Sequence, residues 1–396
     1  MQQAVREAAA QGLPLLLAPG SYRAGGITLP FECTIVGAGV TTAIIAAGDQ
    51  PVFSSEGQRA ITLADFSIVG GGGGAASGGS GLIALTGCSD LTLRNLSLSG
   101  GPGDGLHLDG CAGLVENCTI SGLAGTGIFA NDSAGLRLTG NTISICGNGG
   151  IRVWRSEPGQ DGTIIAHNRV ATIASNGGGN GQNGNGINVF RADGVSILGN
   201  QISGCAFSAI RLNTTANTVV SNNSCLQSGE VAIFSEFAFS GSIIADNVVD
   251  GAAAGISMTN FDQGGRLAVC SGNLVRNIAP LSVVNPDTIP FGIVAQADAV
   301  VSGNVVEGVP GRGIGAGWGP YLRDVVISGN LVRDCEIGIG VSVVDGAGPV
   351  RIDGNMVSGA LRAGLAGMAW QDIVTDDLVG QAYRFANVSL GDNSLV

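Results

Sequence analysis

Short stretches of this chain alternate apolar and polar residues, and two such patterns recur along its length. The first pattern begins with two apolar residues two positions apart. A short polar segment, an asparagine, any residue and then Ile or Val follow, as in 136–143, 195–202 and 350–357. In the second, a glycine precedes Ile-x-Val or a similar triplet, as in 150–153 and 186–189. A period of two is typical of β-strands. Each repeat is therefore predicted to hold two or three short strands, separated by turns rich in Gly, Asn, Asp and Ser.

The asparagines of the first pattern recur at intervals of 22 to 32 residues. Self-similarity at this period predicts a solenoid, because one repeat cannot bury its own apolar stripe whereas stacked repeats bury a continuous core. The strand pattern and the usual hand of parallel connections predict an all-β fold, a single-stranded right-handed parallel β-helix of about a dozen coils. The recurring residues are Asn95, Asn117, Asn141, Asn168, Asn200, Asn223, Asn247, Asn273, Asn304, Asn330 and Asn355.

We expect these asparagines to be structural. An asparagine at the same turn of every coil tolerates left-handed backbone geometry, and its amide can hydrogen-bond to the amides of the neighbouring coils. The resulting ladder would satisfy polar groups inside the coil. His167, which directly precedes Asn168, is expected to be structural as well.

The repeat does not extend over the whole chain. Residues 1–30 are predicted to form an N-terminal cap, with a short amphipathic helix over 2–11 followed by the first strands, because the open end of a solenoid has to be covered. The parallel β-helix is predicted over 31–370. In 371–396 the repeat fades, and this segment is expected to close the stack.

Insertions lengthen some of the repeats. Those at 70–79, 174–186 and 279–290 all precede the Gly-Ile-type strand of the next coil, and a fourth irregular stretch at 155–162 leaves the end of that strand. Insertions at one corner map to one side of a solenoid, and that side is often the binding face.

Composition narrows the function classes. A net charge of −12 and a pI near 4.5 argue against nucleic acid as a partner. No apolar run approaches the length of a membrane span, and these residues contain no signal peptide. The nine cysteines are expected to be buried free thiols, because cysteine is among the most often buried residues. The chain contains no Cys-x-x-Cys pair, so a zinc site is not expected. No metal site is predicted, and neither a cofactor nor the oligomeric state is indicated.

The repeat resembles that of the parallel β-helix proteins, which include pectate lyases, polygalacturonases, alginate epimerases and phage tailspikes. The opening segments Gln-x-Ala-Val-x-x-Ala (2–8) and Leu-Ala-Pro-Gly-Ser-Tyr (17–22) resemble the capping start of secreted pectate-lyase-like proteins. Over nearly its whole length the chain is most similar to an uncharacterised family of twin-arginine-translocated β-helix repeat proteins. This resemblance implies export, to the periplasm or the extracellular space.

The resemblance implies a fold and not a reaction. The chain lacks the paired aspartates, Gly-His-Gly and Arg-Ile-Lys segments of polygalacturonases and the Asp-Pro-His segment of alginate epimerases. It also lacks a clear aspartate cluster like the calcium site of pectate lyases.

Candidate binding residues come from the Gly-Ile-x-Val strand, in which Ile and Val face inward. The residue between them and the residue after Val should face outward, on coils about 4.8 Å apart. Read coil by coil, these positions give a strip of arginines, rings and amides. Clustered guanidinium groups repel unless they are paired or hold an anion, and aromatic faces can stack on sugar rings. The predicted substrate-binding residues are Asn131, Trp154, Arg155, Asn188, Phe190, Arg191, Asn213 and Glu236.

The candidate catalytic residues are His107, Asp109, Arg152 and Arg211. Histidine titrates near neutral pH, and a carboxylate from Asp109 or Asp104 could orient His107 as a base. Arg152 or Arg211 could neutralise a uronate carboxylate, as a lyase or epimerase requires. A hydrolase would need two carboxylates about 5 to 9 Å apart. Asp109 and Glu236 are five coils apart, which leaves Asp109 with Asp132 as the conceivable pair, although Asp132 lies outside the column.

Each candidate also has a structural interpretation. The arginines could form surface ion pairs with Glu236, Asp193 or Glu157, which contribute little stability. The aromatic rings could pack under the 174–186 insertion as a satellite core. His107 could occupy an ordinary Gly-Asp-Gly turn on the surface.

The sequence favours an exported carbohydrate-active protein that binds an acidic, uronate-containing polysaccharide on the outer face of one parallel sheet. A polysaccharide lyase or epimerase is the enzyme considered first, and a glycoside hydrolase is less favoured. The competing hypothesis is a non-catalytic glycan-binding or structural surface protein. Exposure of the His107 ring to the groove would separate the two.

Overall fold

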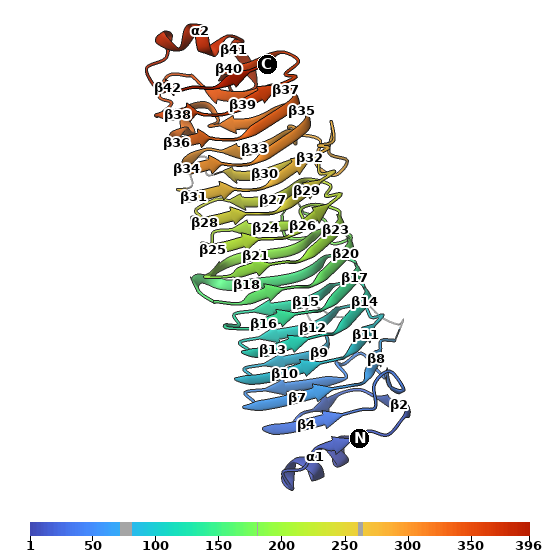
Figure 1. Cartoon of the computed structure of the whole chain (residues 1–396). Helices are drawn as coiled ribbons and strands as arrows, with labels where there is room; N and C mark the ends of the chain where they lie inside the picture. Colours follow the sequence, from blue (N-terminus) through green and yellow to red (C-terminus); the bar gives the residue numbers. More distant parts are fainter. Residues whose placement is uncertain (72–80, 180, 260–263) are drawn as a thin grey trace. The chain divides into compact units, whose positions relative to one another are not determined.

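The alternating repeats fold into coils of short parallel strands (Figure 1). The computed structural model describes residues 1–71, 81–179, 181–259 and 264–396. The chain forms two units, Met1–Cys205 (unit 1) and Ala206–Val396 (unit 2). Each unit is a right-handed parallel β-solenoid, which confirms the predicted all-β fold. Most of the insertion expected at 70–79 lies outside the described residues.

In unit 1 each coil contributes up to three strands, so the unit has three walls of parallel strands. The first wall contains β1 (Leu15–Leu16), β4 (Glu32–Val36), β7 (Ala60–Ala64), β10 (Asp90–Arg94), β13 (Gly113–Glu116), β16 (Arg137–Thr139), β19 (Ile164–Ala166) and β22 (Ser196–Leu198). The second contains β2 (Gly20–Ala24), β5 (Thr42–Ala46), β8 (Ser67–Val69), β11 (Ser97–Ser99), β14 (Thr119–Leu123), β17 (Thr142–Cys146), β20 (Arg169–Ile173) and β23 (Gln201–Cys205). The third contains β3 (Ile27–Thr28), β6 (Phe53–Glu56), β9 (Gly81–Thr86), β12 (Asp104–Asp109), β15 (Thr126–Asn131), β18 (Gly149–Gln160) and β21 (Asn185–Asp193).

Unit 2 has the same arrangement. Its first wall contains β25 (Ala216–Ser221), β28 (Ser240–Ala245), β31 (Arg266–Ser271), β34 (Ala297–Ser302), β36 (Arg323–Ser328), β38 (Val350–Asp353) and β42 (Val388–Leu390). The second contains β26 (Ser224–Leu226), β29 (Val248–Asp250), β32 (Leu274–Arg276), β39 (Met356–Ser358) and β43 (Ser394–Leu395). The third contains β24 (Ile210–Asn213), β27 (Val231–Glu236), β30 (Ala254–Thr259), β33 (Phe291–Ala295) and β40 (Ala363–Ala369). Two longer strands, β35 (Val305–Ala316) and β37 (Leu331–Ser342), run through both the second and third walls.

The core of each unit is a stack of identical or similar apolar residues. In unit 1, Leu106, Ile128, Ile151 and Ile187 pair in register on consecutive strands, and none has exposed surface. Full burial of an aliphatic side chain of this size contributes about 1.5–3 kcal/mol. The inward positions predicted from the Gly-Ile-x-Val pattern are therefore confirmed for these strands.

Both ends of the chain carry a helix. Helix α1 (Gln2–Ala10) buries Val5 and contacts β1 and β4 of unit 1. In unit 2, β41 (Asp372–Thr375) pairs antiparallel with β40, and α2 (Leu378–Gln381) follows. Strands β42 and β43 then resume the parallel pairing, so residues after 371 add strands to the solenoid as well as a helix. The short 3₁₀ helices are η1 (Gly319–Tyr321) and η2 (Ala382–Arg384).

A ladder of buried asparagines runs through the turns, as predicted. The Asn168 amide donates to Asn200 Oδ1 (3.0 Å) and to the carbonyl of Leu138 (2.9 Å). Its Oδ1 accepts hydrogen bonds from the main-chain and side-chain nitrogens of Asn141 (2.9 and 3.0 Å). The ladder of unit 2 contains Asn223, Asn247, Asn273, Asn304, Asn330, Asn355 and Asn393.

Two of the recurring asparagines do not belong to the ladder. Strand pairing places Asn117 beside Gly140, so it lies one position before the ladder position, which Cys118 occupies in that coil. Asn95 and Asn117 have left-handed backbones with φ of 52° and 53°. The expectation of one asparagine position was therefore wrong: the left-handed residue and the ladder residue are consecutive. Asparagine suits the first because it tolerates positive φ, and the second because its amide both donates and accepts.

The cysteines are all free and buried, as expected. Burial raises the pKa of Cys146 and of Cys118 to about 12, so both thiols are neutral and inert at physiological pH. No helix in the described ranges has the length and apolar character needed to cross a membrane.

Replacing a ladder residue should destabilise the protein. We expect Asn168→Ala to lower the free energy of unfolding by about 2 kcal/mol or more, because buried groups of both adjacent coils lose their partners. The matched control is Asn95→Gly, which keeps the left-handed turn and removes only an exposed contact to Asp65. Chemical denaturation monitored by circular dichroism measures both. Equal effects would contradict a stabilising role for the ladder.

Candidate functional site

The outer face of the third wall of unit 1 carries most of the residues predicted to form a site. Four consecutive strands, β12, β15, β18 and β21, pair in register and align the outward positions in two columns. The first column is His107, Phe129, Arg152 and Asn188, and the second is Asp109, Asn131, Trp154 and Phe190. These eight residues of unit 1 lie on one wall, in the order that the sequence pattern predicted.

Four rings form a continuous row across these strands. The ring centroids of His107 and Phe129 are 5.0 Å apart, those of Phe129 and Trp154 5.4 Å, and those of Trp154 and Phe190 6.0 Å. The contacts are edge-to-face, the arrangement that ring quadrupoles favour. All four side chains remain partly exposed. The row is therefore partly open to solvent and not fully buried.

The His107 ring lies within hydrogen-bonding distance of a carboxylate of its own strand. His107 Nδ1 lies 3.1 Å from Asp104 Oδ2, and the other carboxylate oxygen of Asp104 accepts the backbone N–H of Thr126 (2.7 Å). Asp104 is thereby held in place, and the exposed fraction of the His107 side chain is 20%. Because Nδ1 faces the carboxylate, Nε2 is the ring nitrogen left to face a ligand. Asp109 contacts Asn131 (2.9 Å), so the orienting carboxylate is Asp104.

Arg152 is committed to protein contacts. Its Nη2 donates to the carbonyl of Asn148 (2.9 Å) and to Asn183 Oδ1 (2.5 Å), and its guanidinium lies 5.1 Å from the centroid of the Trp154 ring. Its buried Nε has no acceptor among the described residues. Burial lowers the pKa of Arg152, because it penalises the charged form.

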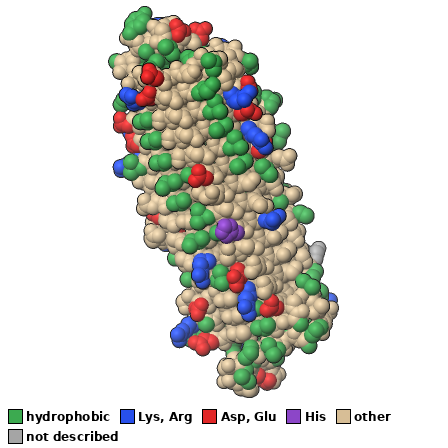
Figure 2. Space-filling view, in the orientation of Figure 1, with side chains coloured by type: hydrophobic (Ala, Val, Ile, Leu, Met, Phe, Trp, Pro, Cys, Tyr) green, Lys and Arg blue, Asp and Glu red, His purple; other side chains and the backbone are tan. Residues whose placement is uncertain are grey.

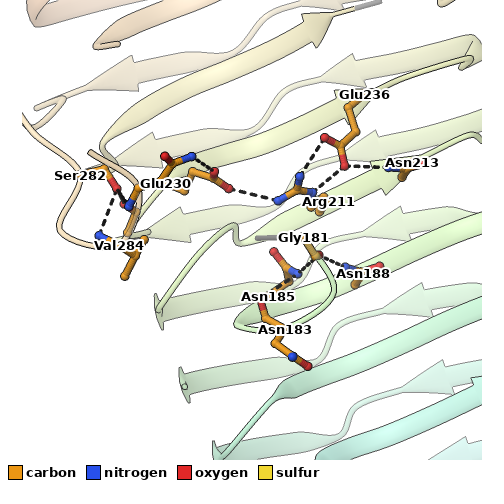
Figure 3. Close-up of polar contacts among 12 residues, drawn as sticks. Gly181, Asn183, Asn185, Asn188, Arg211, Asn213, Glu230, Glu236, Ser282 and Val284 are labelled. Atoms are coloured by element: carbon orange, nitrogen blue, oxygen red, sulfur yellow. Dashed lines mark hydrogen bonds and ion pairs between the residues drawn. The ribbon is translucent and has the colours of Figure 1, made fainter. Parts of the chain in front are cut away.

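The insertion of unit 1 packs against the same columns. Trp154 Nε1 donates to Asn188 Oδ1 (2.9 Å), and the Asn188 amide donates to the carbonyl of Gly181 (3.0 Å), as Figure 3 shows for the latter pair. Asn188 is 5% exposed. Its donors and acceptor therefore fasten the insertion to the wall, so part of the alternative interpretation, packing beneath 174–186, holds here.

The other predicted binding residues of unit 1, Arg155 and Arg191, directly follow Trp154 and Phe190 on β18 and β21. Arg155 Nη1 donates to the carbonyl of Ser133 (3.4 Å), and the Arg191 guanidinium lies 4.8 Å from the Phe190 ring centroid. Neither has an ion-pair partner in the part of the chain that the structure describes. Both arginines are partly exposed, whereas Arg152, which also lies beside a ring of the row, is held by protein acceptors.

Arg211 belongs to unit 2, where two acids hold it (Figure 3). Its Nε and Nη2 donate to Glu236 (2.6 and 2.8 Å), and its Nη1 donates to Glu230 (3.2 Å). Asn213 also donates to Glu236 (2.9 Å). Burial raises the pKa of Glu230, although the Arg211 charge opposes this rise. The predicted pairing of Arg211 with Glu236 is present, but the pair is buried and not on the surface.

The insertion of unit 2 explains this burial. Ser282 donates to the carbonyl of Gly229 (2.6 Å), and Asn285 donates to Glu230 (2.8 Å), so the 279–290 segment folds over the third wall. The outward-facing Ser257 is 2% exposed. Outward positions of unit 2 were expected to be open, and here a covering segment buries them.

A cavity of about 350 Å³ remains between this insertion and the wall. Arg312, Trp318 and Phe291 line it, and none of them was among the predicted site residues. One signal was available: strand pairing aligns Arg312 with Phe291 and Ile337, so an arginine stands where neighbouring coils hold apolar residues. Among the described residues, no group of three His, Cys, Asp or Glu could hold a metal ion.

Most other arginines of unit 2 form exposed ion pairs. Arg276 lies 2.9 Å from Asp250, and Arg323 lies 2.8 Å from Asp298. Blue and red groups accordingly stand next to each other at several places in the space-filling view (Figure 2). Such pairs contribute between 0 and about 1 kcal/mol.

The buried cluster around Arg211 should be far more sensitive to substitution. We expect Arg211→Met to lower the free energy of unfolding by about 3–5 kcal/mol, because it leaves the Glu230 and Glu236 carboxylates without their cation. Arg276→Met, which breaks an exposed pair of the same unit, should lower it by less than about 1 kcal/mol. Chemical denaturation compares the two variants, and similar losses would show that the Arg211 cluster is not a stabilising element.

Comparison with known proteins supports the fold. Residues 80–160 match the family model described as a right-handed β-helix region. The comparison with curated proteins finds no match. Similar solved structures include PfbA, a surface adhesin of Streptococcus pneumoniae (13% identity, 95% of this chain and 90% of that chain, TM-score 0.53). Another is the pre-mature gene product 12 of bacteriophage phi29, with 15% identity and a TM-score of 0.55. The match covers 92% of this chain and 53% of that chain, so this chain spans about half of it. A periplasmic alginate epimerase is a third (12%, 97% and 77%, 0.46).

Proposed function

We propose that this protein binds an acidic polysaccharide along the outer face of the third wall of unit 1. The observation that carries this proposal is the row of four rings, His107, Phe129, Trp154 and Phe190. The row crosses four parallel strands, a distance of about 14 Å from the strand spacing. A regular row of partly exposed rings on a rigid wall suits an extended ligand with repeating flat faces, and a polysaccharide is such a ligand.

The charges beside the row support an acidic sugar. Arg155 and Arg191 flank the rings with partly exposed guanidinium groups, in a chain whose net charge is −12. A planar guanidinium binds a carboxylate through two parallel hydrogen bonds. Arg152 is assigned a positioning role, because Asn148 and Asn183 already accept from it. The Arg211, Asn213 and Glu236 cluster is assigned a structural role in unit 2.

Export to the periplasm or the cell surface belongs to the same proposal. Acidic polysaccharides are found there, and the sequence resembles exported repeat proteins. The non-catalytic alternative, a surface glycan-binding protein, needs the same row of rings and differs only in leaving the sugar unchanged.

Removing the largest ring should weaken binding. We expect Trp154→Ala to reduce the affinity for polygalacturonate or alginate by about tenfold or more, which corresponds to about 1.4 kcal/mol. Phe31→Ala is the control, because the Phe31 side chain is exposed in the same unit but lies outside the row. Surface plasmon resonance on immobilised polymer measures both. Wild-type affinity in Trp154→Ala, with its fold verified by circular dichroism, would refute the proposal.

A second candidate function, a lyase or epimerase acting on uronates, rests on the contact between Asp104 and His107. Both reactions begin by removing the proton at C5, next to the uronate carboxylate. His107 Nε2 would take that proton while Asp104, held by Thr126, orients the ring. The His107 side chain is 20% exposed, so it is not closed off from solvent.

Proton removal can be followed directly. The wild-type protein is incubated with uronate polymers in heavy water, and the products are analysed by mass spectrometry. A lyase should release unsaturated product, and an epimerase should introduce deuterium at C5. We expect His107→Gln to abolish this reaction and to weaken polymer binding less than Trp154→Ala does, because the three larger rings of the row remain. If the wild-type protein causes neither change with any polymer that it binds, the lyase or epimerase function is refuted and the binding function stands alone.

A further inference from the structure

The cavity of unit 2 is a separate site from the row of rings. It lies between the 279–290 insertion and the outer face of β27, β30 and β33, and its volume is at the lower end of the range for small-ligand sites. Its lining includes Phe234, Phe291, Arg312 and Trp318, and the carboxylates of Glu230 and Asp287.

Arg312 is the feature of this cavity that calls for a ligand. Its exposed fraction is 7%, and it has neither a hydrogen bond nor an ion pair with any residue that the structure describes. Burial lowers its pKa to about 10, so the guanidinium is still charged at neutral pH. A buried charge without a partner is unfavourable, and an anion bound in the cavity would remove this penalty.

The surrounding residues hold Arg312 in place. A Cβ atom at Gly340 would lie 2.7 Å from Arg312 Cδ, so a larger residue there would require the arginine side chain to shift. Its guanidinium lies 5.4 Å from the centroid of the Trp318 ring. The Arg312 side chain therefore lies over Gly340 and beside the Trp318 ring, and Arg312 lines the cavity.

The rest of the lining suits a hydroxylated ring. Trp318, Phe234 and Phe291 provide apolar faces, and serine, threonine and amide side chains provide donors and acceptors. Two carboxylates also line the cavity. Both oxygens of Glu230 are already engaged, by Arg211 and Asn285, and Asp287 is exposed on the insertion. The buried Arg312 guanidinium therefore determines the charge of the ligand group at the base of the cavity.

We propose that this cavity binds a single uronic-acid residue, with its carboxylate on Arg312 and its ring against Trp318. A free sugar acid and the end of a uronate polymer present the same carboxylated ring, so both fit this proposal. This site does not depend on the polysaccharide surface of unit 1, because none of the residues that carry that surface lines the cavity.

The test is isothermal titration calorimetry on the full chain with D-glucuronate and D-galacturonate, and with D-glucose as the neutral control. We expect saturable binding of at least one uronate and no binding of glucose. Arg312→Gln should weaken uronate binding about tenfold or more, since it removes a charge-assisted contact. Arg351→Gln, at an exposed pair with Asp353, should bind like wild type.

A second variant keeps the test decisive if Arg312→Gln does not fold. Arg312→Met removes the buried charge while conserving length, so it should raise the Tm of the ligand-free protein by a few degrees and abolish uronate binding. Absence of uronate binding to wild type, equal binding of glucose, or wild-type uronate affinity in Arg312→Met would each overturn the proposal. None of these outcomes would alter the test of unit 1, which uses Trp154→Ala and polymer.

Discussion

In-register hydrogen bonding between consecutive coils is the constraint on which the other features depend. Because Ile128 pairs with Ile151 and Ile151 with Ile187, side chains on these strands have a neighbour at the same position one strand away. Alike residues then form columns: aliphatic side chains inside, asparagine amides in the turns and rings on the outer wall of unit 1. The chain can therefore build an extended surface by repeating one local pattern.

The sequence predicted what repeats. Alternation gave the strands and their inward positions, and the period gave the solenoid, because each depends only on residues within one or two coils. The two outward columns of unit 1 follow from the same reasoning, because the strand register pairs His107 with Phe129 and Asn131 with Trp154. Where the period alone was used, it misled: Asn117 matches the spacing of the ladder but lies one residue before it, at the left-handed position.

The sequence could not predict what the insertions do. A pattern of outward positions says which side of a strand a residue occupies, but not whether a distant segment covers it. Arg211 faces outward and is nevertheless buried, because Glu230, Glu236 and the 279–290 insertion enclose it. Arg312 was not predicted as a site residue, because it occupies a strand position that is apolar in the neighbouring coils. Its cavity also depends on the 279–290 insertion, which forms one side of it.

We assign ligand recognition to rings and guanidinium groups that a rigid wall holds in fixed order. In unit 1 the proposed ligand is an extended polysaccharide. Hydroxyl-radical footprinting with and without saturating polygalacturonate tests this most directly, because oxidation reports the exposure of individual rings. Polymer should protect Trp154 and Phe129 from oxidation and leave the exposed Tyr383 of unit 2 unchanged. Unaltered oxidation of Trp154 in the presence of bound polymer would contradict the account.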